Sequence, residues 1–288
     1  IWGLPEETLD SFIDGVTYIM EEGYHTYLDV HLMMLLPNAP INEPGYKDQF
    51  GIKSVNAQPR FSHRSNPEKL VDDLVSFVTA TRTCSHEDWI KGHQFRWLVI
   101  FGHYLGPLQF ISRGMKKIYE INYKDFYTDL LSFSEKNPQT YIGKEYLTIK
   151  NNLIKILKNE RHWGDVIPNV GDINWEVDEA SCIRLVENKD IFYNEISQYL
   201  ENKYDTEEFI LRDIINYQKA RLHHPFKEYP IYKYFNFNIH DVIENNKSIK
   251  EVKNVLTFTG KNYNNLYEWA KNTLWFGRRI ARYKTKVI

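Results

Sequence analysis

The sequence predicts three successive parts: an α/β fragment, a mainly α-helical domain and a small α+β extension at the C-terminal end. Residues 1–36 combine apolar spacing typical of a helix with the alternation typical of a strand. From residue 66 to about residue 222, apolar residues recur at the interval typical of amphipathic helices. Residues 223–288 contain two stretches, YPIYKYFNFNI and NVLTFTG, whose composition is typical of strands.

The composition is that of a folded globular protein. Of the 288 residues, 42% are hydrophobic, 15% are aromatic and 26% are charged, and the net charge is -2. This charge balance argues against nucleic acid as a partner. No apolar run approaches the ~18 residues that span a bilayer, so we expect no membrane partner either. The two cysteines, Cys84 and Cys182, form no disulfide framework, which fits a cytoplasmic location.

The first part, residues 1–45, is predicted to form a helix followed by a strand. Pro5 and the acidic pair Glu6-Glu7 are suited to the first turn of a helix. Apolar residues then recur at helical spacing, and Gly23 is suited to end the helix. The predicted strand, YHTYLDVHLMMLL, covers residues 24–36.

This predicted strand has an apolar face and a polar face. Apolar residues occupy alternate positions from 28 to 36, whereas Tyr27, Asp29 and His31 share the opposite face with His25. On an enzyme, such a face could orient a substrate or supply an acid and a base. The alternative is a partly solvated strand face with ordinary hydrogen bonds.

The remaining segments follow from capping signals and periodicity. A connecting segment, residues 46–65, precedes the helical domain, residues 66–222. Asn66-Pro67 predict the start of a helix over EKLVDDLVSFVTATRT, and Ser85 predicts the cap of the next one. Residues 223–288 are predicted to form two short strands and a helix over about residues 262–275.

Several groups that suggest chemistry have simpler explanations. His86 and His93 are two helical turns apart, ~10 Å along the axis, too far to share a metal ion. The stretch TFTGK lacks the frame of a phosphate-binding loop. The basic residues of RRIARYKTK are expected to form a solvated end. A glycosyltransferase-like site at Asp29 and His31 would need a DxD metal motif, which the sequence lacks.

The opening stretch, IWGLPEETLDSF, resembles the late part of the radical S-adenosylmethionine (SAM) barrel. In that family a strand often ends in Gly-(Leu/Phe)-Pro-Gly-Glu-Thr, and a helix beginning ESF follows. Gly3-Leu4-Pro5, Glu7-Thr8 and DSF match this pattern, and Glu6 stands where the family usually has glycine. Longer stretches resemble the cobalamin-binding methyltransferase subgroup: GYHTYLDVHLMMLLPNAPINEPGY, FGIKSV, HEDWIKGHQFRWLVIFGHYLGPLQFIS and WFGRRIARY.

The resemblance implies a fold and a site. Residues 1–45 would be late strands and a helix of a partial TIM-like radical SAM barrel, with the helical domain covering its mouth. SAM would lie against two strand ends, formed by Gly3, Leu4, Pro5, Leu35, Leu36 and Pro37. Tyr27, Asp29 and His31 would face the substrate. Because one or two strands cannot bury both faces alone, we expect residues 1–40 to pack on the helical domain.

The same resemblance implies cofactors whose ligands this sequence does not supply. The family uses SAM, a [4Fe–4S] cluster held by a CxxxCxxC motif and, in this subgroup, cobalamin. With only two cysteines, the chain contains neither that motif nor a predicted catalytic or metal-ligating residue. We therefore expect a C-terminal portion that is inactive alone and needs a barrel and a cobalamin domain as partners. Its small-molecule substrate would undergo methyl transfer or a related radical modification.

An alternative function, from a different class, stays open at this point. The chain could be a non-catalytic helical binding module with a small α/β appendage. A cluster motif upstream of Ile1 would favour the enzyme, and an independent start codon near Ile1 would favour the binding module.

Overall fold

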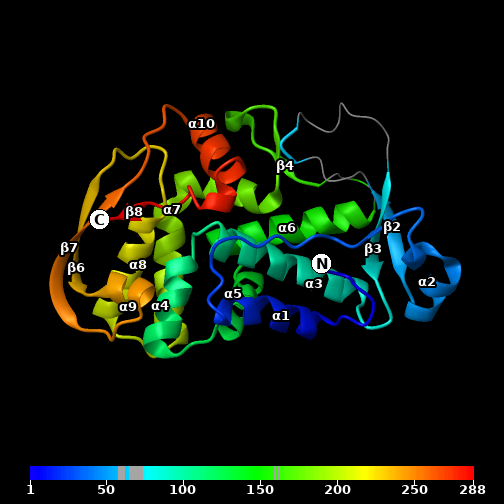
Figure 1. Cartoon of the computed structure of the whole chain (residues 1–288), viewed down its shortest axis with the longest axis horizontal. Helices are drawn as coiled ribbons and strands as arrows, with labels where there is room; N and C mark the ends of the chain where they lie inside the picture. The colour runs from blue at the N-terminus through cyan, green and yellow to red at the C-terminus, as the bar shows by residue number, and fades with distance from the viewer. Residues whose placement is uncertain (58–61, 65–73, 159, 161–162) are drawn as a thin grey trace.

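The computed structural model describes residues 1–57, 62–64, 74–158, 160 and 163–288, and Figure 1 labels its elements. Helix α1, Leu9–Glu21, confirms the first predicted helix and buries an apolar face from Phe12 to Met20. It begins at Leu9 rather than Pro5 because Glu6 has a positive φ of 66°, outside the right-handed helical region. Thr8 caps the helix by accepting a hydrogen bond from the Ser11 amide.

The strand predicted over residues 24–36 is largely wrong. Only β1, Met34–Leu35, is a strand, and Leu32 forms an isolated parallel bridge with Trp2. The backbone before it bonds to side chains instead of to a neighbouring strand. Four carbonyl oxygens accept such bonds: Tyr24 from Tyr104, His25 from Gln109, Thr26 from Tyr283 and Val30 from Arg96.

The bridge at Trp2 does place two segments parallel to each other. The Trp2 amide donates to the His31 carbonyl at 2.9 Å, and the Met33 amide donates to the Trp2 carbonyl at 3.1 Å. The pairing is limited to this isolated bridge, and residues 1–3 form no strand. The described strands form no closed barrel, so the assignment to a TIM-like barrel stays a prediction.

A small antiparallel sheet corrects the prediction for residues 46–83. Its strand order is β1-β3-β2, with β2 at Lys53–Ala57 and β3 at Val75–Ala80. The connecting segment thus contains β2. A 3-10 turn, η1 (Pro40–Asn42), and a short helix, α2 (Pro44–Phe50), precede this strand. The helix predicted over residues 68–83 is wrong at β3, where Phe77 pairs with both Met34 and Val55. The start of that predicted helix lies outside the described residues.

From Ser85 to residue 222 the chain is mainly helical, as predicted. Helix α3, His86–Val99, begins at the predicted cap, Ser85, and continues as a π-helical turn, η3, Ile100–Tyr104. The later helices are α4, Gln109–Tyr119; α5, Tyr123–Lys136; α6, Tyr141–Leu157; α7, Val177–Lys203; and α8, Glu208–Arg221. A two-stranded hairpin lies between α6 and α7, with β4 at Asp165–Val166, η4 at Pro168–Val170 and β5 at Asn174–Trp175.

The C-terminal part contains the two predicted strands and several unpredicted elements. Strand β6, Ile231–Phe237, pairs with β7, Glu251–Thr259, and β7 also pairs with β8, Lys286–Val287. Helix α9, Ile239–Asn245, links β6 to β7. The predicted last helix is α10, Leu266–Ala270, with the π-helical turn η5, Lys271–Trp275, and a 3-10 turn, η6, Arg278–Ile280.

The first part packs on the helices, as expected. In Figure 1, α1, α3 and α6 cross the middle of the molecule between the β1-β3-β2 sheet and the β6-β7-β8 sheet. The Trp2 side chain is fully buried, and its Nε1 donates to the Trp89 carbonyl of α3 at 3.2 Å. Among the described residues, no helix is long and apolar enough to cross a membrane. The division at residues 45, 65 and 222 stays a prediction.

Candidate functional site

The three residues predicted to face the substrate lie together. The Tyr27 hydroxyl donates to Asp29 Oδ2 at 3.2 Å, and the same oxygen lies 3.8 Å from His31 Nε2. The Asp29 side chain is 30% exposed and that of His31 is 69% exposed, so this face is open to solvent. Val30 and Leu32 are buried, as the predicted alternation requires, but Met34 and Leu36 of the same predicted apolar face are 42% and 56% exposed, so the alternation is wrong beyond Leu32.

His25 does not belong to this face, contrary to the predicted alternation. Its Nδ1 lies 3.0 Å from Nε2 of His103, and its carbonyl accepts from Gln109. His103 is fully buried and its Nδ1 lies 2.9 Å from the Tyr127 hydroxyl. Burial lowers the pKa of His25 to about 4 and that of His103 well below its usual value. His25 therefore belongs to a neutral internal network.

The C-terminal segment returns to the open face. The guanidinium groups of Arg278 and Arg279 lie 5.4 and 5.5 Å from the centre of the Tyr27 ring, within the range of a cation–π contact. Arg279 is exposed, whereas Arg278 is only 9% exposed. The expectation of a solvated basic end is therefore wrong at Arg278.

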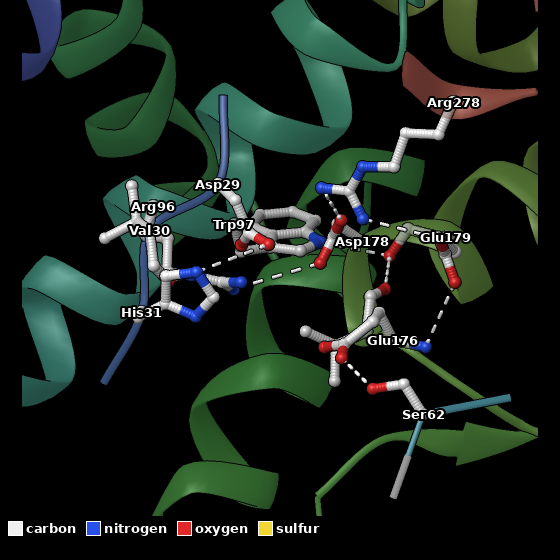
Figure 2. A network of polar contacts seen from close by, with 12 residues as sticks. Asp29, Val30, His31, Ser62, Arg96, Trp97, Glu176, Asp178, Glu179 and Arg278 are labelled. Carbon is white, nitrogen blue, oxygen red and sulfur yellow. Dashed lines mark hydrogen bonds and ion pairs between the residues drawn. The ribbon is translucent and has the colours of Figure 1, made fainter. Parts of the chain in front are cut away.

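Two buried carboxylates at the start of α7 hold Arg278. Its Nη2 lies 3.2 Å from Asp178 Oδ2, and its Nη1 donates to Glu179 Oε1 at 3.4 Å. Arg96 of α3 approaches from the other side, with Nη1 3.8 Å from Asp178 Oδ1, as Figure 2 shows. Because Arg96 also donates to the Val30 carbonyl, this cluster fixes the backbone that carries Asp29 and His31.

Burial and the neighbouring charges shift the pKa values in this cluster. Burial acts to lower the pKa of Arg278, but Asp178 and Glu179 raise it above its usual value. Burial raises the pKa of Glu179, against the effect of His63 and Arg278. The His63 Nε2 lies 2.7 Å from Glu179 Oε2, and its ring stacks on Trp275 at 4.6 Å between centroids. The buried charges are thus paired, and the open polar face lies above them.

The six residues predicted to contact SAM come from two neighbouring segments. Gly3 and Leu35 are buried, whereas Leu4 and Leu36 are 37% and 56% exposed. The parallel bridge at Trp2 means that Gly3-Leu4-Pro5 and Leu35-Leu36-Pro37 leave it in the same direction. The Glu7 carboxylate accepts a hydrogen bond from the Gly3 amide at 3.0 Å and so closes the first of these turns. A SAM contact here stays a prediction.

The described residues do not fit an iron–sulfur cluster or another metal ion. Cys84 precedes α3 and Cys182 lies in α7, and both thiols are buried. Burial raises the pKa of Cys84 to about 12 and that of Cys182 well above its usual value, which disfavours thiolate ligands. Among the described residues, no group of three His, Cys, Asp or Glu side chains could hold a metal ion.

Sequence reasoning missed Arg96, Asp178 and Glu179. Periodicity treats α3 as an ordinary amphipathic helix and the acidic pair as a helix start exposed to solvent. The available signal was the stretch NWEVDEASC, in which adjacent carboxylates directly precede small and apolar residues. Only the packing of α3, α7 and the C-terminal segment brings these charges together.

Comparison with known proteins supports the family suggested by the motifs. No family model matches the chain. Over 214 residues, 69% of this chain, it is 27% identical to the cobalamin-dependent radical SAM methyltransferase TokK of Streptomyces tokunonensis. Over 150 residues, 52% of this chain, it is 29% identical to the 2-(S-pantetheinyl)-carbapenam-3-carboxylate methyltransferase of Streptantibioticus cattleyicolor.

The chain is a homologue of cobalamin-dependent radical SAM methyltransferases. The matched regions span 31% of TokK and 22% of the carbapenam-carboxylate methyltransferase. The radical SAM resemblance is thus confirmed at the level of the family.

Proposed function

We propose that this chain forms the substrate-side portion of a cobalamin-dependent radical SAM methyltransferase. The observation that carries the proposal is the contact of the Tyr27 ring with Arg278 and Arg279. Both segments belong to stretches that resemble the family, and they are far apart in the sequence. The buried cluster around Asp178 holds them in one fixed arrangement.

The open face has the groups needed to orient a polar small molecule. Asp29 supplies a carboxylate beside the His31 imidazole, Tyr27 supplies a hydroxyl, and Arg279 supplies an exposed guanidinium. A guanidinium fork pairs well with a carboxylate. The name of one relative specifies a carboxylate substrate, and we propose that this chain also contacts a carboxylate-bearing small molecule.

A second part of the proposal concerns SAM. Leu4 and Leu36 present exposed apolar side chains at the ends of two parallel segments. We propose that they contact the adenosyl part of SAM, together with Gly3, Pro5, Leu35 and Pro37. The cluster and cobalamin would bind to protein regions outside this chain, corresponding to the unmatched length of the relatives, because the described residues do not fit a cluster.

The first test is a calorimetric titration of SAM into the isolated chain. Because the chain would supply only one wall of the SAM site, we expect no binding tighter than a Kd of about 1 mM. Micromolar binding in the absence of iron would contradict the proposal.

The second test uses the complete gene product, reconstituted with iron, sulfide and cobalamin. We expect it to retain cobalamin and to cleave SAM on reduction. Leu4→Asp and Leu36→Asp should each weaken SAM binding about tenfold, since a carboxylate replaces an apolar contact. Leu147→Asp is the control, because Leu147 of α6 is as exposed as Leu4. A product that retains no cobalamin and cleaves no SAM would favour the binding module instead.

A further inference from the structure

A large cleft lies at the C-terminal end of the molecule, and Tyr27, Asp29 and His31 do not line it. Its volume is about 970 Å³, and its walls come from the end of α8, helix α9, the end of β7 and the last residues of the chain. Figure 1 shows these elements at the end of the molecule opposite the β1-β3-β2 sheet. We call it the C-terminal cleft; its charged lining residues are Arg221, Glu244, Lys261, Arg282, Lys284 and Lys286.

The C-terminal cleft concentrates positive charge in a chain whose net charge is -2. Five basic side chains line it against a single carboxylate, Glu244. That carboxylate is already used, because Oε1 accepts from Arg221 Nη1 at 2.5 Å and Oε2 lies 3.1 Å from Arg113 Nη1. At the rim, Lys261, Arg282 and Lys286 are exposed and pair with no carboxylate of the described residues.

Lys284 lies deeper than the rim residues. Its Nζ lies 5.7 Å from the Phe110 ring centre and 5.5 Å from that of Tyr283, and no carboxylate of the described part pairs with it. Burial lowers the pKa of Lys284 to about 7, with Arg221 and Arg113 adding to the effect and Glu244 opposing it. The buried Nε of Arg221 likewise has no hydrogen-bond partner among the described residues. An anion in the cleft would pair with the Lys284 ammonium group.

We propose that the C-terminal cleft binds a phosphate-bearing small molecule. Lys284 and Arg221 would contact the phosphate at the floor of the cleft. The rim residues Lys261, Arg282 and Lys286 would neutralise the rest of its negative charge. A multiply charged phosphate matches this surplus better than a single carboxylate. The cleft volume also exceeds that of one phosphate group and is in the range of sites that hold cofactor-sized ligands.

The cleft differs from a phosphate-binding loop. Gly260 and Lys261 of TFTGK line it, but the other cations come from α8 and from the C-terminal segment. Recognition would therefore rest on side-chain charge collected from separate elements rather than on backbone amides of one loop. This inference does not depend on the radical SAM function.

Titration of inorganic pyrophosphate into the chain, followed by calorimetry, tests the proposal. We expect a Kd below about 1 mM and at least tenfold weaker binding by the double variant Arg282→Gln/Lys286→Gln. These residues are exposed, so the variant should fold. The matched control is Lys144→Gln/Lys155→Gln, which removes two exposed cations from α6 and should bind as the unaltered chain does.

Three results would overturn the proposal. The first is a Kd for pyrophosphate above about 10 mM. The second is an equal weakening of pyrophosphate binding in the cleft variant and in the α6 variant, which would indicate that only the overall charge of the chain matters. The third is malonate binding as tightly as pyrophosphate, which would show that the cleft takes carboxylates rather than phosphates.

Discussion

Glu6 occupies a backbone conformation that usually favours glycine. Its φ is 66°, and it stands at the position where the radical SAM family usually has glycine. The turn therefore keeps the left-handed backbone conformation although it lacks glycine, the residue that adopts this conformation without steric cost. For a residue with a Cβ atom this conformation costs about 1 kcal/mol.

Replacing this residue should stabilise the protein. Glu6→Gly removes the steric cost of the left-handed conformation, and we expect the free energy of unfolding to rise by up to about 1 kcal/mol. The same change at Glu22, where φ is -72°, should lower it by about 0.5–1 kcal/mol. Urea denaturation of both variants provides the measurement. A loss of stability in Glu6→Gly would show that the Glu6 side chain makes a compensating contact.

Arg278 and Arg279 are neighbours in the sequence but differ in their surroundings. Arg278 is buried between two carboxylates, and Arg279 is exposed above the Tyr27 ring. Removing one partner of a buried ion pair leaves an uncompensated charge in a medium of low dielectric constant.

The pair provides a matched comparison. Arg278→Met should lower the free energy of unfolding by about 3–5 kcal/mol, because Asp178 and Glu179 lose the buried guanidinium that pairs with both of them. Arg279→Met should cost at most about 1 kcal/mol. Denaturation midpoints in urea would measure both changes. Similar losses in the two variants would contradict the buried cluster described here.

At the scale of elements, α3 is the centre around which the first part is organised. The Trp2 ring lies against this helix at Gly92, where a Cβ atom would come within 2.4 Å of the indole. Gly92 thus permits the close approach that buries Trp2 completely. By contrast, Gly15 of α1 has open space around its Cα.

The two glycines should respond in opposite ways to the same substitution. Gly92→Ala should destabilise the protein by about 1–3 kcal/mol, since the new methyl group collides with the Trp2 ring. Gly15→Ala should stabilise it by about 0.5–1 kcal/mol through helix propensity. Thermal unfolding followed by circular dichroism distinguishes the outcomes. A neutral Gly92→Ala would mean that residues 1–3 do not dock on α3.

Across the whole molecule, histidines far apart in the sequence are buried as neutral groups. Burial lowers the pKa values of His25, His223 and His224 to about 4, and that of His103 well below its usual value. In the unfolded chain these residues have pKa values near 6.5. The unfolded state therefore binds more protons than the folded state between about pH 6.5 and pH 4.

Stability should therefore fall as the pH falls through this window. We expect the contribution of these histidines to the free energy of unfolding to be fully retained above about pH 6.5 and to decrease steadily toward pH 4. The raised pKa values of Glu7 and Glu179 act in the opposite direction, whereas the lowered pKa of His240 adds to the effect of the other histidines. Urea denaturation at several pH values provides the measurement, and His25→Gln should show a shallower dependence than the exposed control His86→Gln. A flat profile from pH 7 to pH 4 would contradict the buried neutral state of these histidines.

Local pattern was sufficient for most helices and for the family. The cap at Ser85 and the apolar spacing act within one or two turns, so they can be recognised without tertiary information, whereas α1 begins after Thr8, later than the sequence predicts. The spacing of Tyr27, Asp29 and His31 likewise placed three side chains together. Contacts with SAM and substrate at these positions stay predictions.

The tertiary structure decided the rest because it depends on partners distant in the sequence. The backbone of residues 24–30 is irregular because the side chains of Tyr104, Gln109 and Tyr283 donate hydrogen bonds to its carbonyl oxygens. Residues 75–80 became a strand because β1 and β2 offer backbone partners on both sides. Arg278, which by its local composition is a surface residue, is buried because the packing of α7 brings Asp178 and Glu179 to it. Hydrogen bonds and charge pairs of this kind outweigh local propensity and leave no trace in short-range periodicity.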